Sequence, residues 1–353
     1  MNFFQNTNPF NVNKNIKNKF FLNRIKFLTL HHYRNCSSYK KIIKNIKFNI
    51  NRKNALKDFP MIPVRLFKKL DLKSVSSNKV VKKIVSSGTS GQNLSKIYLD
   101  KENASNQVKV LGKIMSSLLG KERIPMLIVD KNPAFFNKQI FNARLAAIYG
   151  FSIFGKNHCY LLNKKNEIDY RSLNIFLKKY GSKKFLIFGF TSMIFEYLLK
   201  KISVKRLKRK LENGILIHGG GWKKLEKIKI SNAIFKNKLN NKIKLSRVHN
   251  YYGLVEQTGS IFVESNKCGY LHASAYSEIY IRDKNFNVLE NRQKGLIQLL
   301  SLVPTSYPGH NILTEDIGEI IGVDNCKCGL RGKYFIVHGR AKEAEIRGCS
   351  DVR

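Results

Sequence analysis

Two pairs of metal-binding residue types occur in the C-terminal third of the chain. Cys268 and His272 are separated by three residues, and Cys326 and Cys328 are separated by one. Three cysteines and one histidine form a tetrahedral donor set that suits Zn²⁺, with every coordination position filled by the protein. The spacing therefore predicts a structural zinc site. The alternative is four separate residues with a buried, hydrogen-bonded His272.

A loop rich in small hydroxyl residues and glycines lies further upstream, directly after the apolar pair Ile84-Val85. In such a loop the backbone N–H groups are free to converge on an anion, and the hydroxyl groups add donors. No Gly-Lys-Ser/Thr sequence follows, so this is not a Walker loop. We interpret it as a phosphate-binding loop, with an ordinary polar turn as the alternative. Its residues are Ser86, Ser87, Gly88, Thr89, Ser90 and Gly91.

A glycine triplet and a tyrosine–glutamate pair indicate a nucleotide site. Gly219, Gly220 and Gly221 follow a short apolar run, so the backbone can approach a flat ligand at the carboxyl end of a strand. Tyr252 has a ring that can stack on a base, and Glu256 has a carboxylate that can hold Mg²⁺ on a triphosphate. A tight turn into the next helix is the alternative for the triplet.

Two further short motifs carry charged side chains. Asp316, in a Thr-Glu-Asp sequence, can accept hydrogen bonds from sugar hydroxyls, and Arg340 and Lys342 can bring positive charge to a ribose or a phosphate. Each motif is a weak signal alone, because a lone Asp or Arg in a turn is usually solvated or caps a helix.

The elements that must position these residues alternate in the centre of the chain. Short apolar runs each precede a helical pattern, which predicts an α/β fold with a largely parallel sheet. Beyond about residue 262 the pattern changes to strands separated by turn residues, so the C-terminal part is expected to be rich in β-structure. The expected strands are residues 126–129, 185–188 and 215–218, and then 278–282, 296–302, 318–321 and 334–337.

The composition limits the class of protein. The chain of 353 residues has 65 Lys+Arg and 23 Asp+Glu, a formal charge of +42, and an apolar content of 43% that is enough for a large core. Lysine is spread along the whole chain, so we interpret the charge as compositional bias and expect no specific nucleic-acid partner. No apolar run of about 18 residues exists, which excludes a transmembrane helix. No secretory signal precedes the cysteines, so a cytoplasmic, reducing location is expected.

Three regions are expected along the chain. Residues 1–30 form a low-complexity basic leader, of which residues 1 to about 25 are expected to be frayed. Residues 31–338 form the core, and residues 339–353 form a short C-terminal tail.

The order of these motifs resembles the acyl-adenylating superfamily. Within it, the sequence is similar to the acyl-protein synthetase family, the ATP-dependent fatty-acid-activating component of the bacterial luminescence fatty acid reductase. The resemblance implies an acyl-adenylate-forming core that lacks most of the usual mobile C-terminal domain. The segments that carry it are 63–68 (PVRLFK), 218–222 (HGGGW), 252–259 (YGLVEQTG), 306–310 (SYPGH) and 344–351 (AEIRGCSD).

The resemblance also implies roles for the candidate residues. The loop at 86–91 would hold the phosphates of ATP, and the glycine triplet would line the adenine, with Tyr252 packed on it. Glu256 would coordinate Mg²⁺, and Asp316 would bind the ribose hydroxyls with Arg340 nearby. Relatives similar to phenylacetate-CoA ligase carry similar Cys and His positions, which supports the zinc site.

Two departures from the superfamily pattern affect these roles. Asn93-Leu94 stand where the phosphate loop of many members ends in Pro-Lys. The chain also stops four residues after Cys349, so the catalytic lysine of the mobile domain has no counterpart in it. Lys342 is the expected substitute.

In CoA ligases of the superfamily that the sequence resembles, the segment after Gly-Arg lines the thiol tunnel, and the corresponding segment here contains Cys349. Our hypothesis is that its thiolate takes the acyl group of a long-chain fatty acid from acyl-AMP as a thioester. An acyl reductase is the expected partner, and the sequence does not decide whether the two proteins form a stable oligomer. The alternatives are an acyl- or aryl-CoA ligase that uses free CoA, and a catalytically degenerate basic binding protein.

Overall fold

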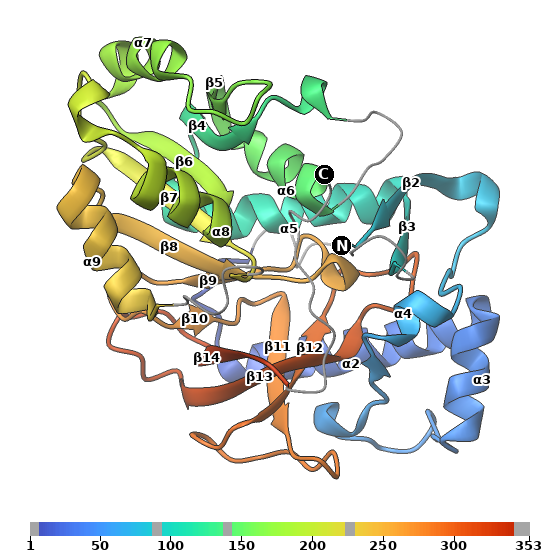
Figure 1. Ribbon diagram of the computed structural model, residues 1–353. Coiled ribbons are helices and arrows are strands. Elements are labelled where there is room, and N and C mark those ends of the chain that lie inside the picture. Colours follow the sequence, from blue (N-terminus) through green and yellow to red (C-terminus); the bar gives the residue numbers. More distant parts are fainter. Residues whose placement is uncertain (1–6, 87–93, 137–142, 223–229, 342–353) are drawn as a thin grey trace. The chain divides into compact units, whose positions relative to one another are not determined.

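The computed structural model describes residues 7–86, 94–136, 143–222 and 230–341. The described chain divides into two compact units. The first unit comprises residues 7–86, 94–120 and 253–341, and the second comprises residues 121–136, 143–222 and 230–252. Figure 1 shows helices alternating with strands in the second unit, whereas strands dominate the C-terminal part of the first. The largely parallel region and the β-rich C-terminal part expected from the sequence therefore belong to separate units.

The second unit is built on a parallel sheet with the strand order β5-β4-β6-β7-β8. Every residue of β6 and β7 is buried, as expected for parallel strands that are covered on both faces. The strands expected at 126–129, 185–188 and 215–218 are confirmed. The sheet comprises β4 (Ile124–Lys131), β5 (Gly155–Leu162), β6 (Phe185–Phe190), β7 (Gly214–Gly219) and β8 (Arg247–Tyr252).

Helices connect these strands and pack apolar stripes on them. In α7 the buried residues are Leu173, Phe176 and Leu177, at the spacing of one helical face. Asp169 begins this helix, because its carboxylate accepts a hydrogen bond from the N–H of Ser172 at 3.0 Å. The helical elements are η3 (Pro133–Phe135), α6 (Ala143–Ser152), α7 (Tyr170–Tyr180), α8 (Thr191–Ile194), the π-helix η4 (Phe195–Lys201), η5 (Val204–Arg206) and α9 (Asn232–Ile243).

The first unit contains an antiparallel sheet with the order β11-β12-β13-β14-β10-β9, and β1 pairs with β13 in parallel. The expected β-rich C-terminal part is confirmed, but β13 begins at Asn311, earlier than expected. Asn311 is buried and donates hydrogen bonds to the carbonyls of Phe59 and Pro60. Its polar side chain interrupts the apolar pattern in the sequence. The strands are β1 (Ile62–Pro63), β9 (Phe262–Glu264), β10 (Leu271–His272), β11 (Ser277–Arg282), β12 (Gly295–Ser301), β13 (Asn311–Val323) and β14 (Lys333–Arg340).

A two-stranded hairpin, β2 (Val80–Val85) and β3 (Lys96–Asp100), precedes helix α5 (Lys101–Leu119) in the first unit. Asp100 caps α5 by accepting a hydrogen bond from the N–H of Asn103 at 2.8 Å. The helix ends at Gly120, whose φ of 90° favours glycine. The remaining short elements are η1 (Leu56–Asp58), α4 (Leu66–Lys69), η2 (Ser77–Lys79) and η7 (Val255–Gln257).

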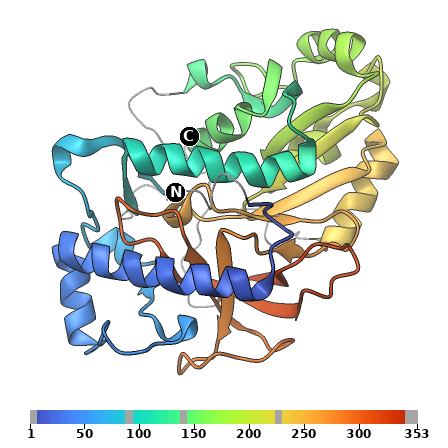
Figure 2. The same ribbon diagram turned by 180° about the vertical axis from the view of Figure 1, so that it is seen from behind.

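The N-terminal segment differs from the expectation of fraying. From Lys14 onward it forms α2 (Lys14–Asn35), which is followed by α3 (Ser37–Asn45). Phe21, Ile25 and Leu28 are spaced by four and three residues and are fully buried. Phe21 and Ile25 pack with apolar residues of β12 and the loop after it, and Figure 2 shows α2 lying along the antiparallel sheet. The many lysines and asparagines of this segment suggested disorder, whereas the structure shows a helix with a few buried residues along one side.

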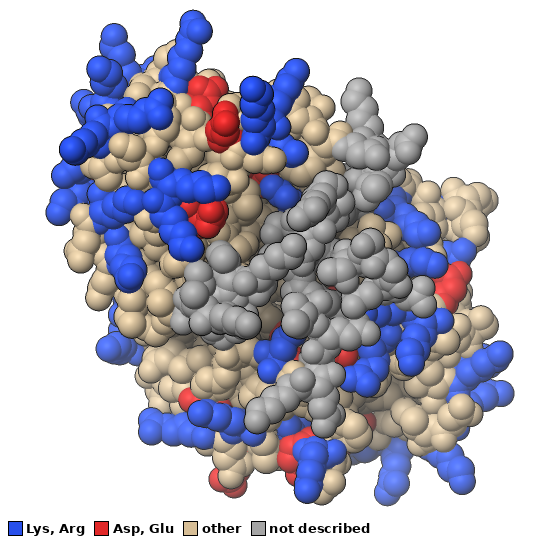
Figure 3. Space-filling model, in the orientation of Figure 1, with Lys and Arg blue, Asp and Glu red and all other residues tan. Residues whose placement is uncertain are grey.

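Positive charge is distributed broadly over the face of the molecule that Figure 3 draws. On the face drawn in Figure 3, Lys and Arg side chains lie over many elements, and acidic side chains are few. This distribution is not a single basic stripe. Among the residues that the structure describes, no helix is both long and apolar enough to cross a membrane.

Candidate functional site

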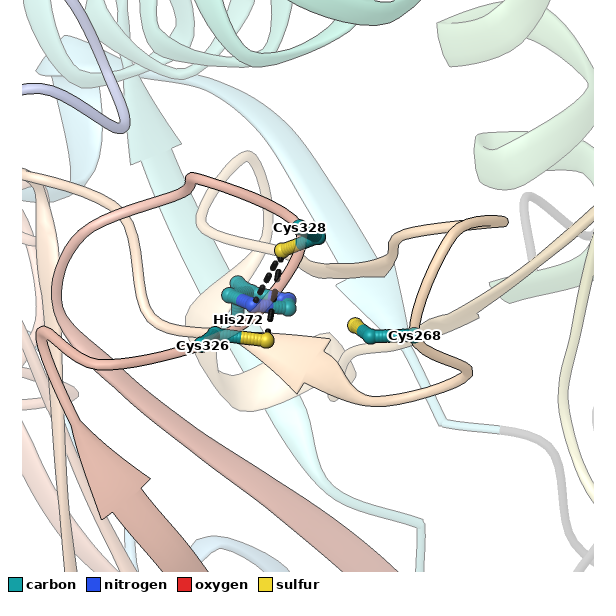
Figure 4. Close-up of side chains that lie close together, drawn as sticks. All are labelled: Cys268, His272, Cys326 and Cys328. Carbon is teal, nitrogen blue, oxygen red and sulfur yellow. Dashed lines mark hydrogen bonds between the residues drawn. The ribbon is translucent and has the colours of Figure 1, made fainter.

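Four side chains of the first unit converge on one point (Figure 4). Cys268 lies in the turn before β10 and His272 is in that strand, whereas Cys326 and Cys328 lie in the loop between β13 and β14. One donor atom from each residue lies within 4.8 Å of the other three. The Sγ of Cys328 is 3.3 Å from Nε2 of His272 and 3.3 Å from Sγ of Cys326. The structure thus brings together the two pairs that the sequence singled out.

Tight turns carry the cysteines on both sides of this cluster. The N–H groups of Cys268 and Gly269 both donate to the Ser265 carbonyl, at 3.3 and 2.8 Å. In the other loop the N–H of Gly329 donates to the Cys326 carbonyl at 3.0 Å. Gly269 and Gly329 have φ angles of 77° and 84°, which glycine adopts without steric cost. The two glycines therefore permit turns sharp enough to direct the thiols to one point.

His272 is held in the tautomer that a metal ligand requires. Its Nδ1 donates to the Tyr270 carbonyl at 2.9 Å, so the lone pair of Nε2 faces the thiols. Burial lowers the pKa of His272 to about 4, which keeps the ring neutral near neutral pH. The imidazole is therefore ready to donate an electron pair to a cation.

The thiols also fit a bound cation. Burial raises the pKa of Cys268 to about 12 and raises the pKa of Cys326. Burial would also raise the pKa of Cys328, but hydrogen bonds, the largest from the Leu330 backbone, lower it overall. Several thiolates this close together repel one another unless a cation is present. A buried set of three thiols and one oriented imidazole at these distances fits tetrahedral Zn²⁺.

Asp316 and Arg340 face each other across the neighbouring strands β13 and β14. They are register partners, and Oδ1 of Asp316 lies 3.8 Å from Nε of Arg340. The side chains are 14% and 30% exposed respectively. A carboxylate can accept several hydrogen bonds, so Asp316 can bind hydroxyl groups while it stays beside Arg340.

Glu256 lies in the short turn η7 and is 2% exposed. The next residue fixes this turn, because Nε2 of Gln257 donates to the carbonyls of Leu299 and Gly309 at 3.0 and 2.8 Å. Gln257 and Gly309 are supporting residues that the sequence reasoning did not identify. Both residues lie in segments that carry the family resemblance, 252–259 and 306–310, but the sequence alone indicated no role for either of them.

The glycine triplet begins at the carboxyl end of β7 in the second unit. A Cβ on Gly219 would lie 2.5 Å from the ring of Tyr251, and Gly220 has a φ of 76°. Both positions therefore require glycine. Tyr251 is buried against Phe151, with ring centroids 5.0 Å apart, whereas Tyr252 is half-buried at the end of β8. Tyr251 is thus a packing residue, and Tyr252 is the more accessible of the two.

His218 precedes the triplet as a neutral, buried side chain. Its Nδ1 lies 3.0 Å from the Thr191 hydroxyl, which donates to the Gly219 carbonyl at 3.2 Å. A hydroxyl group has only one proton, so Nδ1 of His218 must be the donor to Thr191. Burial lowers the pKa of His218 to about 3. This short chain of hydrogen bonds fixes the end of β7 where the triplet begins.

Part of the expected site lies outside the described residues, namely Ser87, Gly88, Thr89, Ser90, Gly91, Lys342 and Cys349. Ser86 is described and buried. Its N–H donates to the Ser95 carbonyl at 3.0 Å, and its Oγ accepts from the Ser95 N–H at 2.9 Å. These two bonds hold the ends of the intervening loop together at the hairpin of β2 and β3.

The family comparison matches almost the entire chain. A family model described as acyl-protein synthetase, LuxE, matches residues 2–353. No curated protein sequence matches the chain.

Solved ligases share the fold at low sequence identity. The open conformation of 2-hydroxyisobutyryl-CoA ligase in complex with 2-HIB-AMP and CoA has a TM-score of 0.74 and 13% identity, covering 95% of this chain and 77% of that chain. The same ligase in the postadenylation state with R3-HIB-AMP has a TM-score of 0.70 and 12% identity, covering 94% and 69%. ATP-bound MatB from Rhodopseudomonas palustris has a TM-score of 0.50 and 15% identity, covering 77% and 50%.

The structural likeness confirms the expected α/β fold of acyl-adenylate-forming ligases. The family match confirms the resemblance that the sequence motifs indicated. The chain belongs to the acyl-protein synthetase family and is a ligase that forms an acyl-adenylate.

Proposed function

We propose that this protein activates a long-chain fatty acid with ATP and then transfers the acyl group to its own Cys349 as a thioester. Membership of the acyl-protein synthetase family supports this sequence of steps. Ligases of the same fold were solved with an acyl-AMP, CoA or ATP bound. The single observation that carries the nucleotide step is the Asp316–Arg340 pair, in which a carboxylate and a guanidinium lie side by side and partly exposed.

In the first step a carboxylate oxygen of the fatty acid attacks the α-phosphorus of ATP. The bond from that phosphorus to the bridging oxygen breaks, and pyrophosphate leaves. Asp316 accepts hydrogen bonds from the ribose hydroxyls, and Arg340 provides positive charge beside it. Glu256 would hold Mg²⁺, which neutralises phosphate charge. A site of this kind accelerates the reaction mainly by positioning and by electrostatic stabilisation.

The remaining nucleotide contacts come from segments rich in glycine and serine, together with Tyr252. Ser86 and residues 87–91 bind the phosphates, Gly219, Gly220 and Gly221 line the adenine, and Tyr252 packs on it. The positive φ of Gly220 and the absence of a side chain at Gly219 support a close approach of the ligand to the backbone. Lys342 supplies positive charge to the phosphates.

In the second step the Cys349 thiolate attacks the acyl carbonyl carbon, the bond to the AMP oxygen breaks, and AMP leaves. Arg347 lies two residues away and favours the thiolate electrostatically. We propose that the tail at residues 339–353 carries this acceptor and that residues 31–338 form the adenylation core together with helix α2, which contains part of the expected leader at residues 1–30 and packs on β12. An acyl reductase then receives the acyl group.

The Cys₃His cluster has a separate, structural role in this proposal. It would hold Zn²⁺ with all four positions filled by the protein, which leaves no open position for a substrate or water. Zinc would therefore connect the turn before β10 to the loop between β13 and β14 and take no part in the chemistry.

Pyrophosphate exchange across a panel of carboxylic acids tests the adenylation step. We expect ATP to incorporate labelled pyrophosphate only when a suitable acid is present, with long-chain fatty acids preferred over short or aromatic acids. A preference for an aromatic acid would contradict the substrate class. The absence of exchange with every acid would favour the degenerate binding protein.

Intact-mass analysis tests the thioester. We expect an acyl adduct that hydroxylamine removes, and we expect Cys349→Ser to abolish the adduct while pyrophosphate exchange continues. Cys159→Ser is the matched control and should keep the adduct. A normal adduct on Cys349→Ser would refute the acyl shuttle, and turnover that requires free CoA would favour the CoA ligase.

A further inference from the structure

Helix α2 holds the loop that connects β12 to β13 (residues 302–310). Nε of Arg24 donates to the Leu302 carbonyl at 3.3 Å. His31 and His32, adjacent on the helix, bond the carbonyls of Thr305 and Pro304 through Nε2, at 2.9 and 3.2 Å. A carbonyl can only accept a hydrogen bond, so both rings carry a proton on Nε2. One helix thus satisfies three backbone acceptors of this almost fully buried loop.

The last residue of the loop lies inside a buried polar cluster. The ring of His310 stacks on His32, with centroids 4.9 Å apart. Nε2 of His310 lies 3.1 Å from the Thr29 hydroxyl and 3.5 Å from the Tyr39 hydroxyl, and the Ser74 hydroxyl lies 2.7 Å from Nδ1 of His32. Burial lowers the pKa of both histidines, so the rings stack without charge repulsion. The N-terminal helices therefore fix both ends of the loop.

The other side of the loop contacts the turn that carries Glu256. A Cβ on Gly309 would lie 2.4 Å from the carbonyl oxygen of Glu256, so the two backbones are in direct contact. The side-chain amide of Gln257 donates to the Gly309 carbonyl at 2.8 Å. A displacement of Gly309 must therefore displace the backbone of Glu256.

We propose that α2 positions Glu256 for binding of the magnesium–triphosphate group through the loop at residues 302–310. Thr29, His32 and His310 are then positioning residues for the adenylation step. The inference rests on the proposed function, in which Glu256 binds Mg²⁺. Magnesium tolerates little departure from octahedral geometry, and residues that support a metal ligand tune its affinity strongly. The N-terminal helices belong to the catalytic apparatus although they contribute no ligand.

Thr29→Val tests this inference, because it removes the hydroxyl beside His310 and keeps nearly the same shape. We expect the Mg²⁺ concentration for half-maximal ATP binding, measured by calorimetry, to rise by up to about tenfold. That is the lower end of the effect of removing a residue that bonds a metal ligand directly, and Thr29 acts on Glu256 only through His310 and Gly309. Binding of AMP without Mg²⁺ should not change. Thr29→Ser restores the hydroxyl and should restore the affinity of the unaltered enzyme. In pyrophosphate exchange, KM for Mg–ATP should rise and KM for the fatty acid should not.

Ile43→Val is the matched control, because Ile43 is buried in α3 and makes no hydrogen bond to the loop through its side chain. It should lower the melting temperature with no change in Mg²⁺ dependence. If Thr29→Val behaves like Ile43→Val, the inference is overturned. If Thr29→Val folds poorly, Tyr39→Phe removes the other hydroxyl near His310 and should raise the Mg²⁺ requirement in the same direction.

The failures of the two proposals are distinguishable. If the unaltered enzyme binds no Mg–ATP, the proposed function is wrong and the inference is overturned with it. If the unaltered enzyme binds Mg–ATP and exchanges pyrophosphate normally while neither hydroxyl variant changes the Mg²⁺ requirement, only the positioning role is overturned.

Discussion

Nε2 of His272 lies 3.3 Å from Sγ of Cys328, although 56 residues separate them in the chain. His272 belongs to β10, which has only two residues, so strand pairing alone gives this segment few hydrogen bonds. The Cys₃His cluster is the additional link between that segment and the loop between β13 and β14. Its metal content should therefore affect the stability of the whole first unit.

We expect about one zinc per chain in protein purified without chelator. Cys326→Ser should lose the metal and lower the unfolding free energy, because the binding of structural zinc, about 10–16 kcal/mol in zinc-finger peptides, is coupled to folding. Elemental analysis and denaturant unfolding measure the two effects. Cys159→Ser replaces a cysteine outside the cluster and should keep the zinc. Well under one zinc per chain in the unaltered protein would contradict the site.

Replacement of Asp316 by Asn should lower kcat/KM for ATP by about 10- to 100-fold, because a hydrogen bond to a charged group contributes about 1.5–3 kcal/mol. Glu319→Gln is the control on the same strand, since Glu319 pairs with His338 at 3.2 Å and has no proposed ligand contact. We expect it to retain the kinetics of the unaltered enzyme. Equal kinetics for the two variants would remove Asp316 from the nucleotide site.

Gly219→Ala should disturb the end of β7, because the new Cβ would lie 2.5 Å from the ring of Tyr251. We expect a loss of stability of about 1–3 kcal/mol from overpacking, together with weaker ATP binding. Gly112→Ala is the opposite control, since nothing lies within 4 Å of its Cβ and it is inside helix α5. Alanine there should stabilise the protein by about 0.5–1 kcal/mol. Unfolding curves that rank the variants in the reverse order would contradict this account.

Acid should destabilise the protein below about pH 6.5. Burial lowers the pKa of His32 well below 6.5, and lowers those of His218 and His310 to about 3. The unfolded chain takes up protons on these residues as the pH falls through 6.5, whereas the folded chain does not. Above about pH 6.5 this effect costs no stability. Below that pH, each buried histidine lowers the free energy of unfolding by about 1.4 kcal/mol per pH unit. Urea midpoints between about pH 8 and pH 5 measure the slope.

His310→Gln is the variant that separates this effect from general acid sensitivity. It should be less stable than the unaltered protein at about pH 8 but should lose less stability between about pH 7 and pH 5. The comparison stays above pH 5 because of Glu278. Burial alone would raise the pKa of Glu278, but Lys17 and Lys333 lower it to about 2, so its contribution is lost only in stronger acid. Parallel pH profiles for the two proteins would contradict the assignment to His310.

The sequence predicted the parallel strands well and the N-terminal helix poorly. The strands at 126–129, 185–188 and 215–218 are continuous apolar runs, which a sheet covered on both faces requires. In α2 the apolar residues are not confined to the buried face, because Ile16 and Phe27 are exposed, so no clear helical period marks the stripe that is buried. Its packing partners lie in β12 and the loop after it, so local pattern could not reveal that it is buried.

Some features of the candidate sites could likewise be predicted from the sequence, and others could not. The types and spacing of the cysteines and His272 indicated one zinc set, because the preference of zinc for these donors is local chemistry. Nothing local indicated that Gly309 contacts Glu256, because that contact depends on how a loop between two strands packs against a separate turn.

The sequence by itself determined the fold class, the family and the identity of the groups able to do chemistry, because apolar periodicity and motif order are written along the chain. Only the tertiary structure decided which of these groups meet. Asp316 faces Arg340 through strand register, and Thr29 reaches His310 across 281 residues. The physical reason is that hydrogen bonds, ion pairs and burial depend on distances in space, and the folded chain sets those distances between segments remote in sequence.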